Sequence, residues 1–360
     1  MVPVMPKDDR LDGKRKAGAR PLWRRIGRSL LIACVVLALP VLVLLAPVAG
    51  TALLCHGETG PVQQSLWTDT PREAGRTFLA YPEWHIVYAY EDYATALETG
   101  APRDMGWMHQ IAGFWSSLCV LMAEADAVGG ATSMTATVYT IGVSFTAEMA
   151  LKGAFEETLG AVVYQPGPVA DLERAMARDY AGFLLQTPWY RYPFQDWLTR
   201  LEALSLDGWK DRLRRAALRL EWAGKAAWAG VITDLAATMP PDALRMDVAL
   251  TEMEGIALPD GWTLVETAGE VRVFEVDRYR AFTTALQQVL AHGAVPQGIA
   301  GNDIILISAL GAALPELPPE VSEIFTYDRS GVTRFLLKLP VALLGELVAR
   351  GVVIEHVYDY

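Results

Sequence analysis

The chain has 360 residues, 52% of them apolar, which is enough to build about two domains with buried cores. Its net charge of −11, from 31 basic and 42 acidic residues, argues against a nucleic-acid-binding protein. The charge is unevenly spread. Nine basic and three acidic residues precede residue 29, so the remainder carries 22 basic and 39 acidic residues, a net charge of −17.

Residues 1–28 are basic, and an uncharged, mostly aliphatic run from Ser29 to Cys55 follows them. The run is long enough to cross a bilayer of about 30 Å as a helix. We therefore expect residues 29–52 to form a single anchor in the cell (inner) membrane, with a cytoplasmic stub over 1–28 and the bulk of the chain extracytoplasmic. The alternative is a signal peptide cleaved near Val48, although its apolar core would be unusually long.

The chain has three cysteines, and Cys34 lies within the expected anchor. This leaves Cys55 and Cys119 as the only candidates for an extracytoplasmic disulfide. An oxidising compartment permits that pair. Two unpaired thiols are the equally expected alternative.

After a polar linker over 56–70, we expect an all-helical domain over 71–240. Thr70, Pro71 and Glu73 form a capping-box pattern that predicts a helix beginning at residue 71. Glycine and proline breaks separate the expected helices, which cover 71–80, 82–98, 104–125, 133–160, 171–186, 195–204 and 208–239.

Two segments of this domain, 105–123 and 128–147, carry no Asp, Glu, Lys or Arg, and each is nearly long enough to span a membrane. The connection between them holds Glu124 and Asp126 and no basic residue, which disfavours a cytoplasmic loop. We therefore expect a buried helical hairpin. Two further membrane spans, or a helix pair lying on the bilayer surface, are the alternatives.

Alternation of apolar and polar residues predicts an α+β domain over 245–360. Thr263–Glu266 and Val271–Val276 form a hairpin, and a helix to about Ala291 and a strand over Asp303–Ser308 follow it. The same order recurs in a hairpin of 323–327 with 332–337, a helix from Pro340 to Gly351 and a strand over 352–358. Two hairpin-helix-strand units predict a pseudo-repeated domain, with ferredoxin-like layering as the nearest architecture.

A short internal repeat is the most specific signal in the helical domain. Glu148–Phe155 (EMALKGAF) aligns with Glu221–Trp228 (EWAGKAAW), and in both segments Glu precedes Lys by four residues. Such spacing places each pair on one helix face. Two such helices related by a twofold axis would bring Gly153 close to Ala226. Structural ion pairs are the simpler interpretation, and Glu148 and Glu221 become candidate catalytic residues if they converge on one cavity.

The densest run of functional side chains is Tyr81–Tyr93. Aromatic burial would raise the pKa of Glu91, which makes Glu91, with His85, a candidate general acid or base. Glu83 and His109 are candidate metal ligands, although no histidine falls in a common metal-binding motif. A carboxylate-rich metal site would need residues from several helices, namely Glu83, Glu91, His109, Glu148 and Glu221. Structural roles for all of them are the competing interpretation.

Pro188–Trp197 contains five aromatic residues. In a membrane-anchored protein, Trp and Tyr beside Arg suit the bilayer interface, so Trp189, Tyr190, Tyr192 and Trp197 are candidate lipid contacts. An ordered aromatic loop within the helical domain is the alternative.

Two functions remain open. The first is a membrane-anchored extracytoplasmic binding or assembly factor of the cell envelope, with a protein partner at the α+β domain. The second is a carboxylate- and histidine-dependent enzyme, with or without a metal, acting on a lipid or another envelope substrate. The chain lacks glycine-rich phosphate loops, a serine nucleophile elbow and a Cys-x-x-Cys motif, so the sequence indicates neither a reaction nor a cofactor.

Overall fold

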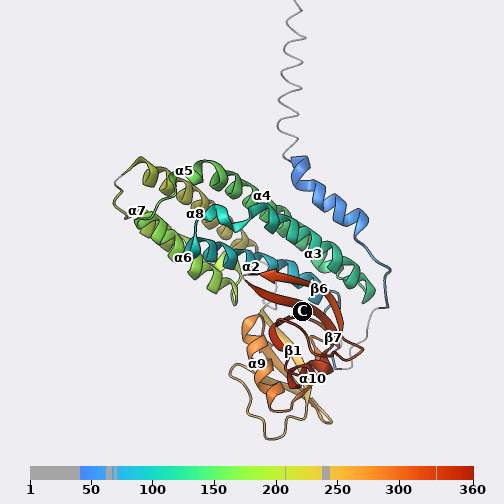
Figure 1. Cartoon of the computed structure of the whole chain (residues 1–360). Helices are drawn as coiled ribbons and strands as arrows, with labels where there is room; N and C mark the ends of the chain where they lie inside the picture. The colour runs from blue at the N-terminus through green and yellow to red at the C-terminus, as the bar shows by residue number, and fades with distance from the viewer. Residues whose placement is uncertain (1–40, 62–66, 69–70, 207, 237–243, 330) are drawn as a thin grey trace, which may run out of the picture. The chain divides into compact units, whose positions relative to one another are not determined.

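A computed structural model describes residues 41–61, 67–68, 71–206, 208–236, 244–329 and 331–360 (Figure 1). The expected stub over 1–28 and the first part of the expected anchor, residues 29–40, lie outside these ranges. Residues 41–54 are helical. Among the helices of the described part of the chain, none combines the length and apolar composition that a membrane crossing needs. Residues Pro47–Tyr360 form one compact unit, which the following paragraphs describe.

The first half of this unit is helical, as expected. Its long helices are α2 (Arg76–Thr99), α3 (Trp107–Ala127), α4 (Thr132–Phe155), α6 (Pro168–Leu184), α7 (Phe194–Glu202) and α8 (Trp209–Ala236). Short elements join them: η1 (Pro102–Met105), the π-helical turn η2 (Glu156–Gly160), α5 (Ala161–Val163) and η3 (Trp189–Arg191). The uncharged segments form the expected hairpin, because α3 and α4 pack together and bury Phe114, Trp115 and Phe145.

The beginning of the helical region differs from the prediction. The helices expected over 71–80 and 82–98 are one helix, α2, which begins at Arg76 and continues through Pro82. Thr70, the expected cap, lies outside the described residues, and Glu73 acts at a different helix. Its carboxylate accepts hydrogen bonds from the Ser133 backbone N–H at 3.0 Å and the Thr132 hydroxyl at 2.7 Å, so it caps the N-terminus of α4 instead. Ser133 lies 60 residues after Glu73, so the sequence around Glu73 does not indicate this contact.

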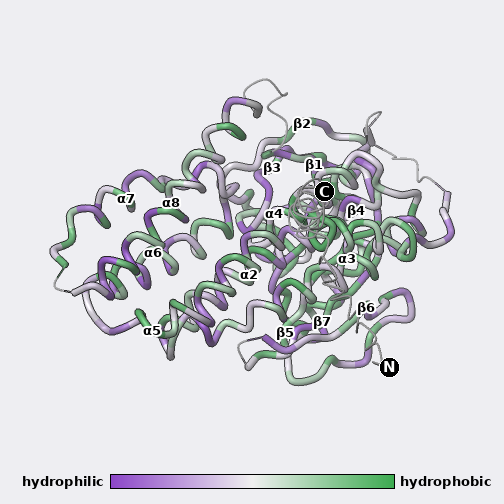
Figure 2. Tube along the Cα trace, turned by 90° about the horizontal axis from the view of Figure 1, so that it is seen from above, coloured by the Kyte–Doolittle hydropathy of each residue, from purple (hydrophilic) through white to green (hydrophobic). Residues whose placement is uncertain are grey.

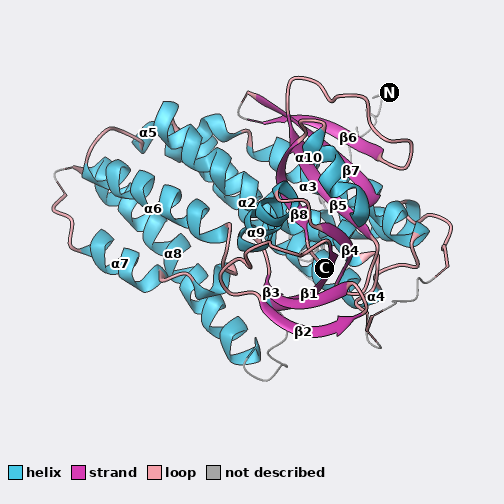
Figure 3. Ribbon diagram, turned by 90° about the horizontal axis from the view of Figure 1, so that it is seen from below, coloured by secondary structure: helices cyan, strands magenta, loops and turns pink. Residues whose placement is uncertain are grey.

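The second half is an α+β region with two four-stranded antiparallel sheets (Figure 3). The first sheet has the order β2-β3-β1-β4 and the second has the order β6-β7-β5-β8. The strands of the first are β1 (Arg245–Thr251), β2 (Thr263–Ala268), β3 (Val271–Asp277) and β4 (Val295–Ile299). Those of the second are β5 (Ile304–Leu310), β6 (Ser322–Arg329), β7 (Val332–Pro340) and β8 (Val353–Tyr358). Helix α9 (Arg280–Ala291) lies between β3 and β4, and η5 (Val341–Leu343) with α10 (Leu344–Ala349) lies between β7 and β8.

The predicted repeat is present, but its boundaries differ. Each unit is three strands, a helix and a fourth strand, so the strand expected over 303–308 opens the second unit and does not close the first. Even the irregularities recur: the register shift between Ala249 and Leu250 of β1 has its counterpart between Ser308 and Ala309 of β5. One helix per four-stranded sheet differs from the two crossover helices of ferredoxin-like layering.

The second sheet joins the two halves of the molecule. One of its faces contributes Leu306, Leu336 and Tyr358 to the core of the helical region, and its other face shares a core with the first sheet, α9 and α10. Thr77 of α2 lies at this junction. Its hydroxyl donates to the Tyr358 carbonyl at 2.6 Å and accepts from the Leu306 N–H at 3.0 Å. Helix α2 is therefore held in the core of the unit, where it also positions the side chains described next.

Candidate functional site

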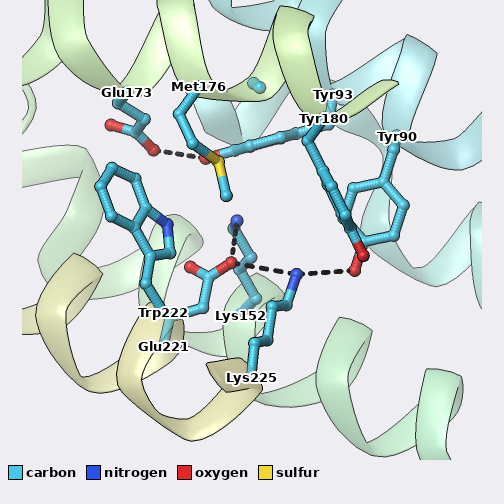
Figure 4. A pocket seen from close by; sticks show the side chains of 10 residues that line it. Tyr90, Tyr93, Lys152, Glu173, Met176, Tyr180, Glu221, Trp222 and Lys225 are labelled. Carbon is cyan, nitrogen blue, oxygen red and sulfur yellow. Dashed lines mark hydrogen bonds and ion pairs between the residues drawn. The ribbon is translucent and has the colours of Figure 1, made fainter. Parts of the chain in front are cut away.

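The two repeated segments meet in the helical region and form a ladder of ion pairs. Figure 4 shows the part of it formed by Lys152, Glu221 and Lys225. Lys152 of α4 lies 2.7 Å from Glu221 of α8, and Lys225 of α8 lies 2.7 Å from Glu148 of α4. Lys225 is also 3.5 Å from Glu221 within its own helix. The glutamate of each repeat therefore pairs with the lysine of the other repeat, and the two segments run antiparallel where they meet. We refer to Glu148, Lys152, Glu221 and Lys225 as the ladder.

Aromatic side chains enclose the ladder. The Tyr90 hydroxyl of α2 donates to Glu148 and accepts from Lys225. The Lys152 ammonium group lies 3.9 Å from the centre of the Tyr93 ring, a favourable cation–π geometry. The space between the side chains in Figure 4 is a cavity of about 10 Å³, which is room for about one water molecule. Glu221 lines this nearly filled space but Glu148 does not, so the two carboxylates do not converge on this cavity as the catalytic hypothesis required.

The electrostatics of the ladder favour permanently charged groups. Burial acts to raise the pKa of Glu221, but Lys152 and Lys225 outweigh it and hold that pKa below its usual value. Burial acts to lower the pKa of Lys225, but Glu148 and its other neighbours raise it well above the usual value. A general acid or base works best with a pKa near the working pH. The pKa values of Glu221 and Lys225 are instead shifted away from neutral pH, as is usual in structural ion pairs.

A second cluster lies next to the ladder and was not predicted. Arg214 of α8 contacts Glu156 at 2.6 Å and Glu173 of α6 at 2.5 Å, and all three side chains are almost fully buried. Tyr93 donates a hydrogen bond to Glu173 and so connects this cluster to the ladder. Glu156 begins the π-helical turn η2 and borders a hollow of about 90 Å³. Ligand pockets usually enclose about 300–1,000 Å³, so this hollow is small for a substrate.

One sequence signal could have revealed this cluster. Arg214, Leu218 and Trp222 are spaced four residues apart and therefore lie on one face of α8. Leu218 and Trp222 are buried, so a charged residue in their row must be buried as well and needs an anionic partner. The partners, Glu156 and Glu173, lie 58 and 41 residues away and have no local pattern that identifies them.

The other candidate catalytic residues lie elsewhere. His85 is buried between α2 and α3, where its Nε2 is 3.0 Å from the Gln110 carbonyl oxygen, and burial lowers its pKa to about 4. Glu91 is half-buried on a different face of α2 from Tyr90. Burial raises the pKa of Glu91, and Arg329 acts in the opposite direction. Neither residue lines the ladder cavity.

The candidate metal ligands also lie apart. Glu83 is half-buried, and burial raises its pKa against the opposing effect of Arg278. His109 is exposed near the start of α3. Within the described ranges, no three His, Cys, Asp or Glu side chains are grouped closely enough to hold a metal ion. The structure therefore does not bring Glu83, Glu91, His109, Glu148 and Glu221 into one site.

The aromatic run beginning at Pro188 is mostly inward-facing. Tyr192 and Trp197 are buried, and the Tyr192 hydroxyl donates to Asp179 of α6 at 2.8 Å. Trp189 and Tyr190 are half-buried against the same core. Because α7 places Phe194, Trp197 and Leu201 on its inner face, this segment closes the end of the helical region. Tyr192 and Trp197 thus pack within the core of the helical region.

Two glycines of the repeat give a matched test of packing near the ladder. Gly153 packs tightly against α3, because a methyl group on Gly153 would lie 2.6 Å from the Trp107 Cβ atom. Gly224 faces open space. We expect Gly153→Ala to lower the free energy of unfolding by about 1–3 kcal/mol and Gly224→Ala to raise it by up to about 1 kcal/mol. Urea unfolding of both variants measures this; equal effects would contradict the packing described.

His85 predicts a dependence of stability on pH. Its pKa falls from 6.5 to about 4 on folding, so the folded state disfavours protonation. The stabilisation is complete above pH 6.5 and is lost as the pH falls toward 4, by about 3 kcal/mol in total. In His85→Gln, which keeps a donor for the Gln110 carbonyl, we expect the decline in unfolding free energy over this range to be smaller by that amount. Exposed His292→Gln is the control, and parallel profiles for all three proteins would refute the prediction.

Comparison with known proteins adds no function to this geometry. No family model, curated protein or solved structure matches the chain.

Proposed function

We propose that the protein is a membrane-anchored, extracytoplasmic binding or assembly factor of the cell envelope. The observation that carries the proposal is the disulfide between Cys55 and Cys119, which attaches the last residue of the uncharged run to the middle of α3. Disulfides persist in oxidising compartments and are rare in the cytoplasm. The pairing therefore favours the orientation that the basic stub and uncharged run predict, with residues after about 52 outside the cytoplasm.

The closed ladder favours binding over catalysis. Its charged groups are paired with one another, its cavity has room for about one water molecule, and the remaining acid, base and metal candidates lie apart from it. A carboxylate-dependent enzyme acting on a lipid would need space for a substrate next to an acid or base of suitable pKa. The geometry of the ladder better suits a rigid helical body that supports a binding surface.

The edge of the first sheet is the best candidate for the protein partner. All six residues of β2 are exposed, Val265 at 60%, and among the described strands only β3 pairs with it. An exposed edge strand offers unpaired backbone groups to an extended peptide. We place the partner contact of the α+β region there.

Cysteine labelling in intact cells tests the topology. A cysteine at exposed Ser205 should react with a membrane-impermeant maleimide before lysis, and a cysteine at Ala17 in the basic stub should react only after lysis. The reverse pattern would refute the extracytoplasmic location. For the edge strand, a photo-crosslinking residue at Val265 should capture a partner polypeptide, whereas one at Val353 of β8, 57% exposed, should not. Equal capture at both positions would remove β2 from the proposal.

A further inference from the structure

Helix α8 carries a row of large apolar side chains on its outer face. Its members recur four or seven residues apart, so they follow one side of the helix: Trp209, Leu213, Leu220, Ala227 and Val231, with Trp228 beside them. Leu220 is 79% exposed, Trp209 58% and Trp228 49%. The opposite side of α8, with Leu218 and Trp222, is buried in the helical region. Figure 2 shows the resulting alternation of hydrophilic and hydrophobic residues along α8. We call the exposed row the α8 stripe.

Basic side chains lie beside the α8 stripe. Between Trp209 and Leu220, α8 has five basic residues, Lys210, Arg212, Arg214, Arg215 and Arg219, and one acidic residue, Asp211. Asp211 accepts a hydrogen bond from Gln165, and Arg214 is buried. Arg212 and Arg219 are exposed at the edge of the stripe, and Arg219 pairs with Glu202 of α7 at 2.9 Å. Lys210, Arg212 and Arg215 still outnumber Asp211, so a local excess of positive charge remains in a part of the chain whose net charge is −17. The stripe is therefore suited to an anionic surface.

The composition of the stripe distinguishes lipid from protein. Helices that lie in the bilayer interface combine Trp and Leu on one face with Lys or Arg at its margins. Tryptophan is enriched at the level of the lipid headgroups. The stripe has a tryptophan near each end, and from Trp209 to Val231 it extends about 33 Å along the helix. Asp234 follows it on the exposed side.

The chain also restricts how far the helical region can lie from a membrane. The expected anchor ends at residue 52, and Cys55 is bonded to Cys119 of α3. Residues 53 and 54 are helical, and three residues span at most about 10 Å even when fully extended. If the anchor spans the bilayer, α3 is therefore held close to the lipid headgroups, and α8 belongs to the same compact unit.

We propose that the α8 stripe lies on the surface of an anionic phospholipid bilayer, with its leucine, valine and tryptophan side chains among the headgroups and Arg212 beside lipid phosphates. This inference rests on the proposed membrane anchoring and extends it. The anchor fixes one point of the molecule to the membrane, and the stripe fixes its orientation.

Fluorescence quenching by brominated lipids tests the contact. The full-length protein is reconstituted into vesicles of phosphatidylcholine and phosphatidylglycerol whose acyl chains carry bromine close to the headgroup. We expect quenching of tryptophan emission in the unsubstituted protein and a loss of much of that quenching in Trp209→Phe/Trp228→Phe. Trp262→Phe, in the α+β region, is the matched control and should leave the quenched fraction unchanged. Leu220→Glu should reduce quenching with both tryptophans retained, whereas Leu258→Glu, in an exposed loop, should not.

The outcomes separate this inference from the proposed function. In one outcome, alkaline carbonate does not extract the protein from the vesicles, and quenching is the same in the double variant and the unsubstituted protein. This result would overturn the inference about the stripe but would not contradict the anchor. Extraction of the protein by carbonate would contradict the anchor itself. If Leu220→Glu converts a dimer to a monomer in detergent without changing quenching, the stripe binds a second copy, and the lipid assignment is wrong.

Discussion

Replacing Arg214 by Met is expected to lower the free energy of unfolding by about 3–5 kcal/mol, because two buried carboxylates lose their only close cationic partner in the cluster. Arg214 contacts Glu156 and Glu173, and all three side chains are almost fully excluded from solvent. The loss of an attractive pair is the smaller part of the cost. The larger part is the uncompensated negative charge that remains in the core.

Arg219 provides a control on the same helix. Its pair with Glu202 has a similar distance, 2.9 Å, but both side chains are more than half exposed. We expect Arg219→Met to change the free energy of unfolding by less than about 1 kcal/mol. Arg214→Lys should fall between the two, because it keeps the charge but cannot contact both carboxylates in the same geometry. Urea unfolding of the detergent-solubilised protein measures all three variants, and equal effects of Arg214→Met and Arg219→Met would refute the role given to the buried cluster.

Removal of the disulfide should have a comparably large effect. Cys55 and Cys119 are separated by 64 residues, and a loop of that length gives about 4 kcal/mol in the chain-entropy description. The double variant Cys55→Ala/Cys119→Ala is therefore expected to unfold at a clearly lower denaturant concentration. A reducing agent should bring the unsubstituted protein to the same midpoint and should leave the double variant unchanged. Identical midpoints for the oxidised protein and the double variant would show that the bond does not support the fold.

Local sequence patterns predicted most of the helices and both hairpins. They failed where contacts between residues distant in sequence determine the secondary structure. Pro82 indicated a helix boundary, yet α2 continues through it within the packed core. Strand β4 was missed because it contains Pro296 and Gly298, residues that weaken a strand signal. In the fold, Pro296 lies opposite Leu250 at a register shift on the edge of the sheet, where a missing backbone N–H is tolerated. Because the sequence patterns predicted neither β1 nor β4, they placed the boundary between the two repeat units incorrectly.

The site was predicted in part, for a physical reason. The repeated Glu-x-x-x-Lys spacing identified the four ladder residues, because the spacing of charges along a helix is visible in sequence. The pairing of Glu148 with Lys225 and of Lys152 with Glu221 depends on how α4 and α8 pack. Helix packing is not visible in the local sequence, so these pairs could not be predicted from it. His85 and Glu91 were grouped by their closeness in sequence. In the structure their side chains leave α2 in different directions.

We propose that the chain is anchored in the membrane, folds on its oxidising side and is stabilised there by the disulfide of Cys55 with Cys119. Thiol trapping in cells tests it most directly. Cells are lysed into denaturant with an alkylating maleimide, with and without prior reduction, and alkylated cysteines are counted by mass. Without reduction, Cys55 and Cys119 should remain unmodified and should gain two labels only after reduction. Both residues fully labelled before reduction would contradict the account.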